Sequence, residues 1–414
     1  MEFDSLAHAT WDAGMWERLR WLREHDPVHW DARNQIWVIT RHADVSQVSK
    51  QSELFCSGQG VRPGSPVRLS LVDMDEPRHG QLRQLVNRGF TPRMVGRLET
   101  SFRRLTREAV DRVAARGECD FVRDIAVPLP LELIAEMIGI PGEDRDRFQR
   151  WSDALIGGDG HFDDPEALAG SAAAFVEYAD YLQHIFEARR REPRDDLVSI
   201  LVNERDSGVL GSAGADADPA AFGLPGHATV AELANDELVM FMVLLLVAGN
   251  ETTRNAITGG MSALIENPWE REKLARDPAL LKSAVEEIVR YVSPVLNFAR
   301  TATRDAELRG RQIARWQKLL LVYPSANRDA EVFEQPDRFR VDRQPNPHLG
   351  FGVGNHFCLG ANLARMELRV VLEECLRRLP DIEYAEGPPR SVPSTLVRSF
   401  VAMPVRFTPE RKAA

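Results

Sequence analysis

The most informative part of this sequence is FGVGNHFCLG at residues 351–360. It places Cys358 among glycines, directly ahead of a helical pattern that begins at Ala361. A cysteine at a helix N-terminus lies close to unpaired backbone N–H groups and to the positive end of the helix dipole, and both favour the metal-binding thiolate. The glycines remove side chains where a flat group would lie against the backbone. The alternative is a small buried cysteine in a glycine-rich turn.

A second unusual segment, AGNETT at residues 248–253, interrupts a long apolar helix that is predicted to begin at Thr229 or Asn235 and to end at about Ile265. A glycine inside a helix costs about 1 kcal/mol relative to alanine. A buried glutamate is also costly unless it is paired or hydrated. Unfavourable residues gathered at one point indicate a functional site. The alternative is a polar patch that faces another helix.

The composition restricts the class of protein. The 414 residues are enough for one large domain or for two or three ordinary ones, and the net charge of −10 argues against a general nucleic-acid binder. Residues 1–6 do not resemble a signal peptide, and the longest apolar run, 239–249, is shorter than the roughly 20 residues that cross a bilayer. We therefore expect a cytoplasmic protein without a membrane anchor. The four cysteines are far apart, which excludes a disulfide framework and a zinc knuckle.

Both segments resemble motifs of the cytochrome P-450 (haem-thiolate monooxygenase) family. Residues 351–360 resemble its haem-binding loop, and residues 248–253 resemble its oxygen-binding segment A-G-x-[D/E]-T-[T/S]. Two further motifs follow the family pattern, an H-x-x-x-R pair and an E-x-x-R pair, namely His79 with Arg83 and Glu287 with Arg290. The resemblance implies one domain over residues 1–414 with a mainly α fold, a small β region, the shape of a triangular prism and a long central helix over the haem.

The resemblance also implies the site. Cys358 would be the iron ligand of a non-covalently held haem b, since the sequence has no C-x-x-C-H. Glu251 and Thr252 would relay protons to bound dioxygen. The implied cofactor contacts are His79, Arg83, Gly249, Arg300, Phe351, Gly352, His356 and Gly360. For His79 and Arg83 the alternative is a solvated helix face.

The E-x-x-R pair would belong to a structural charge network that braces the cysteine loop. Its third member is expected to be Arg338, with Arg343 as the alternative. Two positions depart from the family pattern. Trp316 occupies a hairpin that usually contains glycine, so a turn with positive φ is not expected there. Ser399 stands in a pocket loop where relatives often carry glycine.

The substrate is predicted to be a hydrophobic small molecule, because AGNETTRN at 248–255 and CLGANLAR at 358–365 look most like actinobacterial hydroxylases of steroid and isoprenoid side chains. The candidate pocket residues are Val61, Leu69, Leu71, Leu244, Ala248, Val295, Phe298 and Val397. Fatty acids and secondary metabolites such as macrolides and polyketides are alternative substrates. A peroxide-using peroxygenase and a non-catalytic haem carrier or gas sensor are alternative classes, but neither needs the acid–alcohol pair.

Electrons would come from a ferredoxin and its NAD(P)H-dependent reductase, since the chain contains no flavin or iron–sulfur motif. An arginine-rich segment offers a docking patch for an acidic partner. The arginines of this segment are Arg93, Arg97, Arg103, Arg104 and Arg107. The alternative is a solvated helix face. We expect a monomer. Residues 206–228 are rich in Ala, Gly and Asp and are predicted to form a flexible surface insertion. Residues 58–66 are predicted to form an irregular loop, and the resemblance implies that this loop covers the substrate side of the haem.

Overall fold

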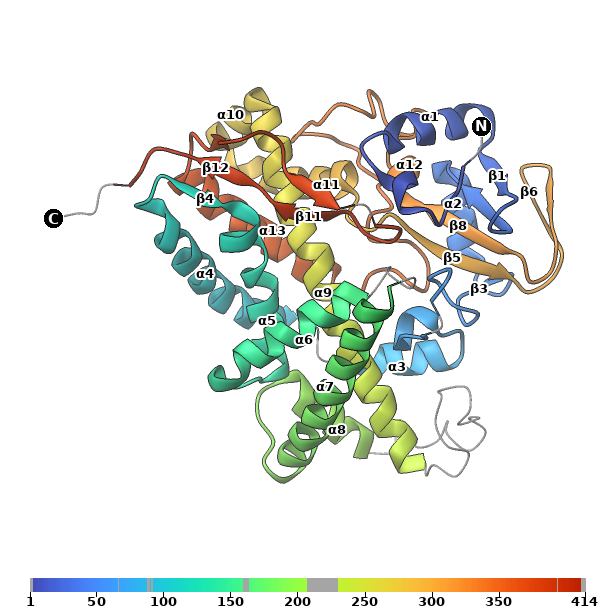
Figure 1. The fold of residues 1–414 in the computed structure, drawn as a ribbon, viewed down its shortest axis with the longest axis horizontal. Coiled ribbons are helices and arrows are strands. Elements are labelled where there is room, and N and C mark those ends of the chain that lie inside the picture. The colour runs from blue at the N-terminus through green and yellow to red at the C-terminus, as the bar shows by residue number, and fades with distance from the viewer. Residues whose placement is uncertain are drawn as a thin grey trace. The chain divides into compact units, whose positions relative to one another are not determined.

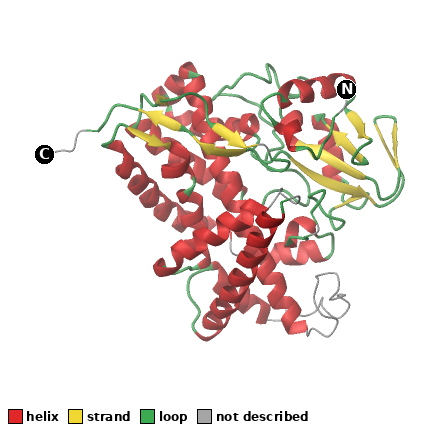
Figure 2. Cartoon of the chain, in the orientation of Figure 1, coloured by secondary structure: helices red, strands yellow, loops and turns green. Residues whose placement is uncertain are grey.

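The computed structural model describes residues 3–65, 67–87, 90, 92–158, 164–206, 230–392 and 394–410. Within these ranges helices dominate and the strands form a few small sheets (Figures 1 and 2). The predicted mainly α fold with a small β region is therefore confirmed. The insertion predicted at residues 206–228 lies outside the described residues, apart from Asp206 at the end of a helix.

The chain forms two compact units. The first unit comprises residues 1–63, 99–130 and 251–414, and the second comprises residues 64–98 and 131–250. Three helices contribute residues to both units, namely α4 (Pro92–Ala114), α5 (Pro128–Ile138) and α9 (Val230–Glu266). The single domain predicted over residues 1–414 stays a prediction.

The second unit is helical. Besides parts of α4, α5 and α9 it contains η2 (Ser70–Asp73), α3 (Arg78–Asn87), η5 (Gly142–Asp144), α6 (Arg145–Gly158), α7 (Pro165–Arg191) and α8 (Leu197–Asp206). Aromatic packing joins α6 to α7, since the rings of Trp151 and Tyr178 have centroids 5.4 Å apart. Helix α9 is fixed to α6 where its polar interruption begins, because Asn250 Nδ2 donates to Ser152 Oγ at 2.8 Å.

The first unit holds the strands. Its helical elements are η1 (His8–Trp11), α1 (Met15–His25), α2 (His42–Lys50), η4 (Val122–Ala126), α10 (Pro268–Arg276), η7 (Pro278–Leu280), α11 (Leu281–Val292), α12 (Tyr323–Ala326) and α13 (Ala361–Arg378). Its strands are β1 (Val28–Asp31), β2 (Ile36–Ile39), β3 (Phe55–Cys56), β4 (Glu118–Asp120), β5 (Asn297–Ala302), β6 (Ala306–Leu308), β7 (Arg311–Ile313), β8 (Lys318–Val322), β9 (Glu383–Tyr384), β10 (Arg390–Val392), β11 (Ser399–Ala402) and β12 (Pro404–Arg406).

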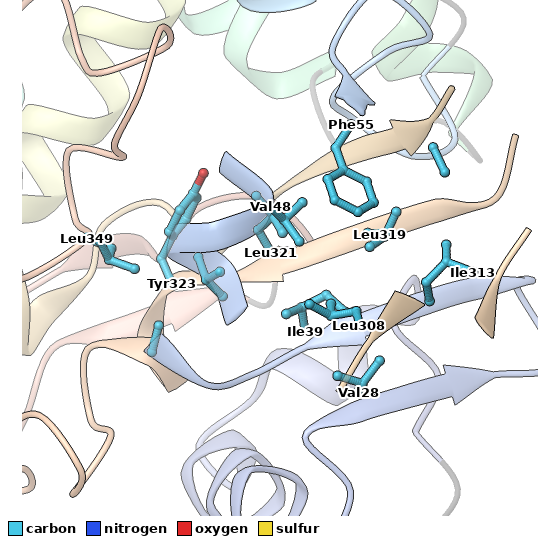
Figure 3. Packing of buried hydrophobic residues seen from close by; sticks show 13 residues of the cluster. Val28, Ile39, Val48, Phe55, Leu308, Ile313, Leu319, Leu321, Tyr323 and Leu349 are labelled. Atoms are coloured by element: carbon cyan, nitrogen blue, oxygen red, sulfur yellow. The ribbon is translucent and has the colours of Figure 1, made fainter. Parts of the chain in front are cut away.

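The largest sheet of the first unit has the strand order β1-β2-β8-β5-β3. Strands β2 and β8 pair in parallel, with Ile36 opposite Lys318, and the other neighbours are antiparallel. The smaller sheets have the orders β4-β12-β9, β10-β11 and β6-β7. Side chains from the large sheet and from α2, including Val48, Phe55 and Leu321, pack into one buried cluster (Figure 3). Leu349 belongs to this cluster, so the segment that leads to Cys358 is anchored in the core of the sheet.

Helix α9 runs without interruption from Val230 to Glu266, so its predicted extent is confirmed. Its apolar segment is buried, as illustrated by Leu238, Phe241 and Leu246. Burial of this segment is expected for a helix that is mostly apolar, and α9 contributes residues to both compact units.

The E-x-x-R pair forms a buried charge network. Glu287 and Arg290 are fully buried on α11, and Arg290 donates to both carboxylate oxygens of Glu287, at 2.7 and 2.8 Å. The third guanidinium belongs to Arg343, whose Nε lies 3.0 Å from Glu287 Oε2. The prediction of Arg338 was wrong. Arg338 offers its backbone carbonyl to Arg290 and Arg343, while its exposed side chain reaches Gln335.

The network is connected to the cysteine loop through one asparagine. Arg290 donates to the carbonyl oxygen of Asn327 at 2.8 Å, and Asn327 Oδ1 accepts the backbone N–H of Leu349 at 2.7 Å. Each donor and acceptor in this path is satisfied by another member, as burial requires. A shift of the charge network would therefore move the start of the cysteine loop.

The turn before β8 corrects a second expectation. Trp316 has φ of 72°, so a turn with positive φ forms here without glycine. Three hydrogen bonds hold it: Trp316 N donates to Ala302 O at 2.8 Å, and Gln317 Oε1 accepts from Ala314 N and Trp37 Nε1, each at 2.8 Å. The left-handed conformation costs a side chain about 1–2 kcal/mol, which these bonds offset.

The charge network gives a matched pair of variants. Arg343→Ala should lower the free energy of unfolding by about 3–5 kcal/mol, because it leaves part of the Glu287 charge buried without its partner. Arg338→Ala should change it by only about 0.5 kcal/mol, because that side chain is exposed. Urea unfolding of the holoprotein followed by circular dichroism measures both. Equal losses in the two variants would show that the assignment of Arg343 is mistaken.

Candidate active site

The segment from Leu349 to α13 presents a cysteine at the surface of the first unit. Gly352 and Gly354 have positive φ values of 68° and 80°, which glycine adopts without strain. A Cβ atom on Gly354 would also lie 2.8 Å from the carbonyl oxygen of Ser49, so the loop approaches the end of α2 too closely for a side chain. The backbone N–H of Cys358 donates to Phe351 O at 2.8 Å, which closes the loop.

Cys358 differs from the other three cysteines in exposure. Cys358 is exposed, whereas Cys56, Cys119 and Cys375 are buried. Burial raises the pKa of Cys119 to about 12 and raises the pKa of Cys375 further. Those two thiols stay protonated at neutral pH and are unsuitable as metal ligands. The structure therefore leaves Cys358 as the cysteine that a large flat group could reach.

The loop is braced by ion pairs from α13 and α11. The guanidinium carbon of Arg365 lies 4.5 Å from the ring centroid of Phe351. Arg365 also donates to both carboxylate oxygens of Glu286, at 2.6 and 2.8 Å, and His348 Nε2 lies 3.1 Å from Glu286 Oε2. Burial alone would raise the pKa of Glu286, but the hydrogen bonds and charges of Arg365 and His348 lower it to about 2. The ion pair of Glu286 with Arg365 therefore stays charged at neutral pH.

Arg300 and His356 provide hydrogen-bond donors in the first unit. Arg300 is 4 % exposed and donates from one Nη atom to the carbonyl oxygen of Ala299 at 2.7 Å. Among the described residues no carboxylate pairs with this guanidinium. A buried charge without a counter-ion is costly, so an anionic group supplied by a ligand would suit this position. His356 Nε2 lies 3.0 Å from Ser57 Oγ. These residues fit the propionate groups of a haem.

One face of α9 stays accessible although the helix is apolar. Ala248 is exposed, and Leu245, Gly249 and Thr252 are half-buried; their spacing places all four on one side of the helix. This face is tightly packed at one point, since a Cβ atom on Gly249 would lie 3.0 Å from Ile134 Cδ1 of α5. Close packing against α5 is therefore one physical reason for glycine at this position.

Glu251 is buried and held on both carboxylate oxygens. Asn255 Nδ2 donates to Oε1 at 2.7 Å, Ser399 Oγ lies 3.4 Å from the same oxygen, and Arg254 forms an ion pair with Oε2. These three partners of Glu251 were not predicted from the sequence. The positions of Arg254 and Asn255, three and four residues after Glu251, were a signal that could have revealed them. No sequence signal indicates the contact with Ser399.

The remaining predicted site residues divide between the two units. In the first unit, Val295 and Val397 pair as an isolated antiparallel bridge, and Val61 O accepts the backbone N–H of Ala299 on β5 at 2.7 Å. Phe298 of β5 packs against the buried cluster of Figure 3. In the second unit, Leu69, Leu71 and Leu244 are buried.

The predicted H-x-x-x-R pair lies on α3 of the second unit. His79 is 2 % exposed and its Nδ1 lies 3.1 Å from Glu76 Oε1, whereas Arg83 is half-buried. The burial of His79 shows that the solvated-face alternative does not describe it. The role of the pair in binding a cofactor stays a prediction.

The arginine-rich segment of α4 carries less free charge than its sequence suggests. Arg97 forms an ion pair with Asp195, Arg103 pairs with both Glu99 and Glu373, and Arg104 pairs with Glu108. Arg107 donates to the carbonyl oxygen of Arg103, and the side chain of Arg93 lies outside the described residues. Because carboxylates compensate these arginines, local charge alone does not single out the segment as a docking site.

None of the helices in the described part of the chain combines the length and the apolar character that crossing a bilayer requires.

The family model described as "Cytochrome P450" matches residues 164–407. The chain is 39 % identical over 399 residues to a steroid C26-monooxygenase of Mycolicibacterium smegmatis, with 96 % of the chain and 94 % of the relative covered. It is 40 % identical over 394 residues to a steroid C26-monooxygenase of Mycobacterium tuberculosis, with 94 % and 93 % covered.

Solved structures of similar proteins give the same fold. CYP109E1 of Bacillus megaterium, in complex with testosterone, superimposes with a TM-score of 0.81 at 32 % identity, covering 95 % of the chain and 99 % of that structure. CalO2 superimposes with a TM-score of 0.86 at 29 % identity, covering 99 % of each chain.

The ion pair of Glu286 predicts a dependence of stability on pH. Because its pKa is lowered from 4.5 to about 2, the pair stabilises the fold fully above about pH 4.5, and this contribution is lost as the pH falls toward 2. Glu286→Gln should therefore lower the free energy of unfolding at pH 7 by about 1–3 kcal/mol and reduce its slope between pH 4.5 and pH 3. Urea unfolding across this range measures both effects.

Glu53→Gln, which alters an exposed carboxyl of the same unit, is the control and should leave the stability at pH 7 and the slope unchanged. A Glu286→Gln slope identical to that of the unmodified protein would contradict the lowered pKa.

Proposed function

The chain belongs to the cytochrome P450 family, and on this premise we propose that it hydroxylates a C–H bond of a steroid side chain with one oxygen atom of O2. Membership of the family establishes a monooxygenase with a cysteine-ligated haem. The assignment to this chain's own residues rests on Cys358, which is exposed. It lies in a loop that contains two glycines with positive φ and that side chains of α11 and α13 brace.

In this proposal Cys358 is the thiolate ligand of haem b. The haem, when bound, supplies the binding and activation of O2, and thiolate ligation favours O–O cleavage. Phe351, Gly352 and Gly360 shape the loop around the ligand, and the closure of Cys358 N on Phe351 O supports this role. The buried Arg300 supports binding of a propionate, since it would gain the counter-ion that the described residues do not supply.

We propose three further residues as hydrogen-bond donors to the propionates, because their motifs resemble those of the family: His356, His79 and Arg83. Gly249 and Ala248 are proposed to line the haem and substrate side of α9, which the accessibility of that face supports. Thr252 and Glu251 are proposed to move protons toward the oxygen-binding position. A buried carboxylate and a half-buried hydroxyl at adjacent positions suit such a relay.

A steroid substrate is favoured by the two steroid C26-monooxygenases to which the chain is similar over more than nine-tenths of its length. The apolar candidates for the pocket are Val61, Leu69, Leu71, Leu244, Val295, Phe298 and Val397. A ferredoxin and its NAD(P)H-dependent reductase are the proposed electron donors. A peroxygenase would not need Glu251 and Thr252, so turnover with ferredoxin and NAD(P)H but without peroxide would exclude that alternative.

The ligand assignment is tested by reducing the purified protein with dithionite in the presence of carbon monoxide. The unmodified protein should show the red-shifted Soret band of a thiolate-ligated haem, and Cys358→Ser should lose it. Cys56→Ala, which changes a buried cysteine of the same unit, should keep the band. A band that survives in Cys358→Ser would refute the assignment.

The substrate class is tested by titrating the ferric protein with sterols, terpenoids, fatty acids and a macrolide and recording the Soret band. Cholesterol should shift the band, because apolar side chains that line a pocket favour a hydrophobic ligand. The absence of a shift with every sterol, together with a shift with a fatty acid or macrolide, would assign the chain to one of the alternative substrate classes.

A further inference from the structure

Glu251 is held by a set of residues that joins helix α9 to strand β11. Asn255 is central to it, because Nδ2 donates to Glu251 Oε1 at 2.7 Å while Oδ1 accepts the backbone N–H of Phe400 at 2.9 Å. The residue before Phe400 is Ser399, whose hydroxyl lies 3.4 Å from the same oxygen of Glu251. Strand β11 is thus joined to the helix at two adjacent residues, one of which contacts the acid directly.

The partners of Glu251 differ in the hydrogen bonds that they can form with a carboxyl group. The guanidinium of Arg254 and the amide Nδ2 of Asn255 only donate hydrogen bonds, so neither group can accept the proton of a carboxylic acid. A serine hydroxyl can donate to a carboxylate and can also accept a hydrogen bond from a carboxylic acid. The acceptor of Asn255, Oδ1, faces the backbone N–H of Phe400. The hydroxyl of Ser399 is therefore the group beside Glu251 Oε1 that can accept its proton when that acid becomes protonated.

The distances from Glu251 to its partners agree with this difference between Ser399 and the other two side chains. The contact of Ser399 is long, whereas an O–H···O⁻ hydrogen bond is usually about 2.5–2.7 Å. The carboxyl group of Glu251 is consequently held mainly by Arg254 and Asn255. Protonation would remove the charge that Arg254 attracts and would leave the hydroxyl of Ser399 as the available acceptor.

Resting on the proton-relay role proposed above for Glu251, we propose that Ser399 is a positioning residue that holds the protonated Glu251 in place. A relay acid alternates between its two protonation states in each cycle, and a carboxylic acid that loses its partners on protonation would be free to rotate out of its position. The Ser399 hydroxyl prevents this, because it contacts Glu251 in both states.

The test compares Ser399→Ala, which removes the hydroxyl, with Ser399→Thr, which keeps it, in the holoenzyme supplied with a ferredoxin, its reductase, NADPH and cholesterol. Ser391→Ala is the matched control, because Ser391 is exposed on β10 directly opposite Phe400. Ser399→Ala should raise the ratio of hydrogen peroxide released to product formed by about fivefold, the change expected for the loss of one hydrogen bond. It should also increase the solvent deuterium isotope effect, while Ser399→Thr and Ser391→Ala keep the unmodified values.

A spectroscopic readout is independent of turnover. The infrared C=O band of protonated Glu251 is identified by its absence in Glu251→Gln. It should move to higher frequency in Ser399→Ala, because the acid loses its hydrogen-bond acceptor. In Ser399→Thr the band should have the frequency of the unmodified protein, because the acceptor is kept. An unchanged band and an unchanged peroxide ratio in Ser399→Ala would overturn the proposal.

Two outcomes separate this inference from the proposed function. If Glu251→Gln raises peroxide release but Ser399→Ala does not, the relay stands and the role of Ser399 is refuted. If Glu251→Gln has no effect on peroxide release, the relay itself is refuted and the role of Ser399 with it.

Discussion

The buried ionic network of Glu287, Arg290 and Arg343 is the interaction on which the first unit depends most. One carboxylate is shared by two guanidinium groups, and the remaining N–H donors of those groups bond to backbone carbonyls. Such a network is stable only when every member is present, because removing one leaves a charge in a region without water. Asn327 connects it to Leu349, so the position of the cysteine loop follows from the geometry of these charges.

Helix α11 braces that loop twice, through two adjacent glutamates. Successive residues of a helix point about 100° apart, so neighbouring side chains reach different surroundings. Glu287 points into the buried network, whereas Glu286 pairs with Arg365 at the ring of Phe351. A glycine-containing loop has little rigidity of its own. The two glutamates supply that rigidity from outside, which is what a metal ligand with a required direction of approach needs.

Helix α9 shows how a functional segment is accommodated in an apolar element. Glu251 is an unfavourable residue for a buried helix, and the chain holds it locally with Arg254 and Asn255 and across the fold with Ser399. The two local partners lie one turn away, and Arg254 neutralises the charge. The distant contact adds a group that can respond to protonation. The same residue can therefore be stable in the fold and still take part in the proton transfer that we propose.

The sequence by itself determined the elements and the contacts within them. The long helix α9 and the pairing of Glu287 with Arg290 both follow from spacings of three to seven residues along one helix. Contacts between distant segments were decided only by the tertiary structure. Arg338 and Arg343 lie in an irregular segment where no periodicity predicts direction, and Ser399 meets Glu251 across 148 residues. Local spacing determines which side chains share a face, whereas the path of the folded chain determines which faces meet.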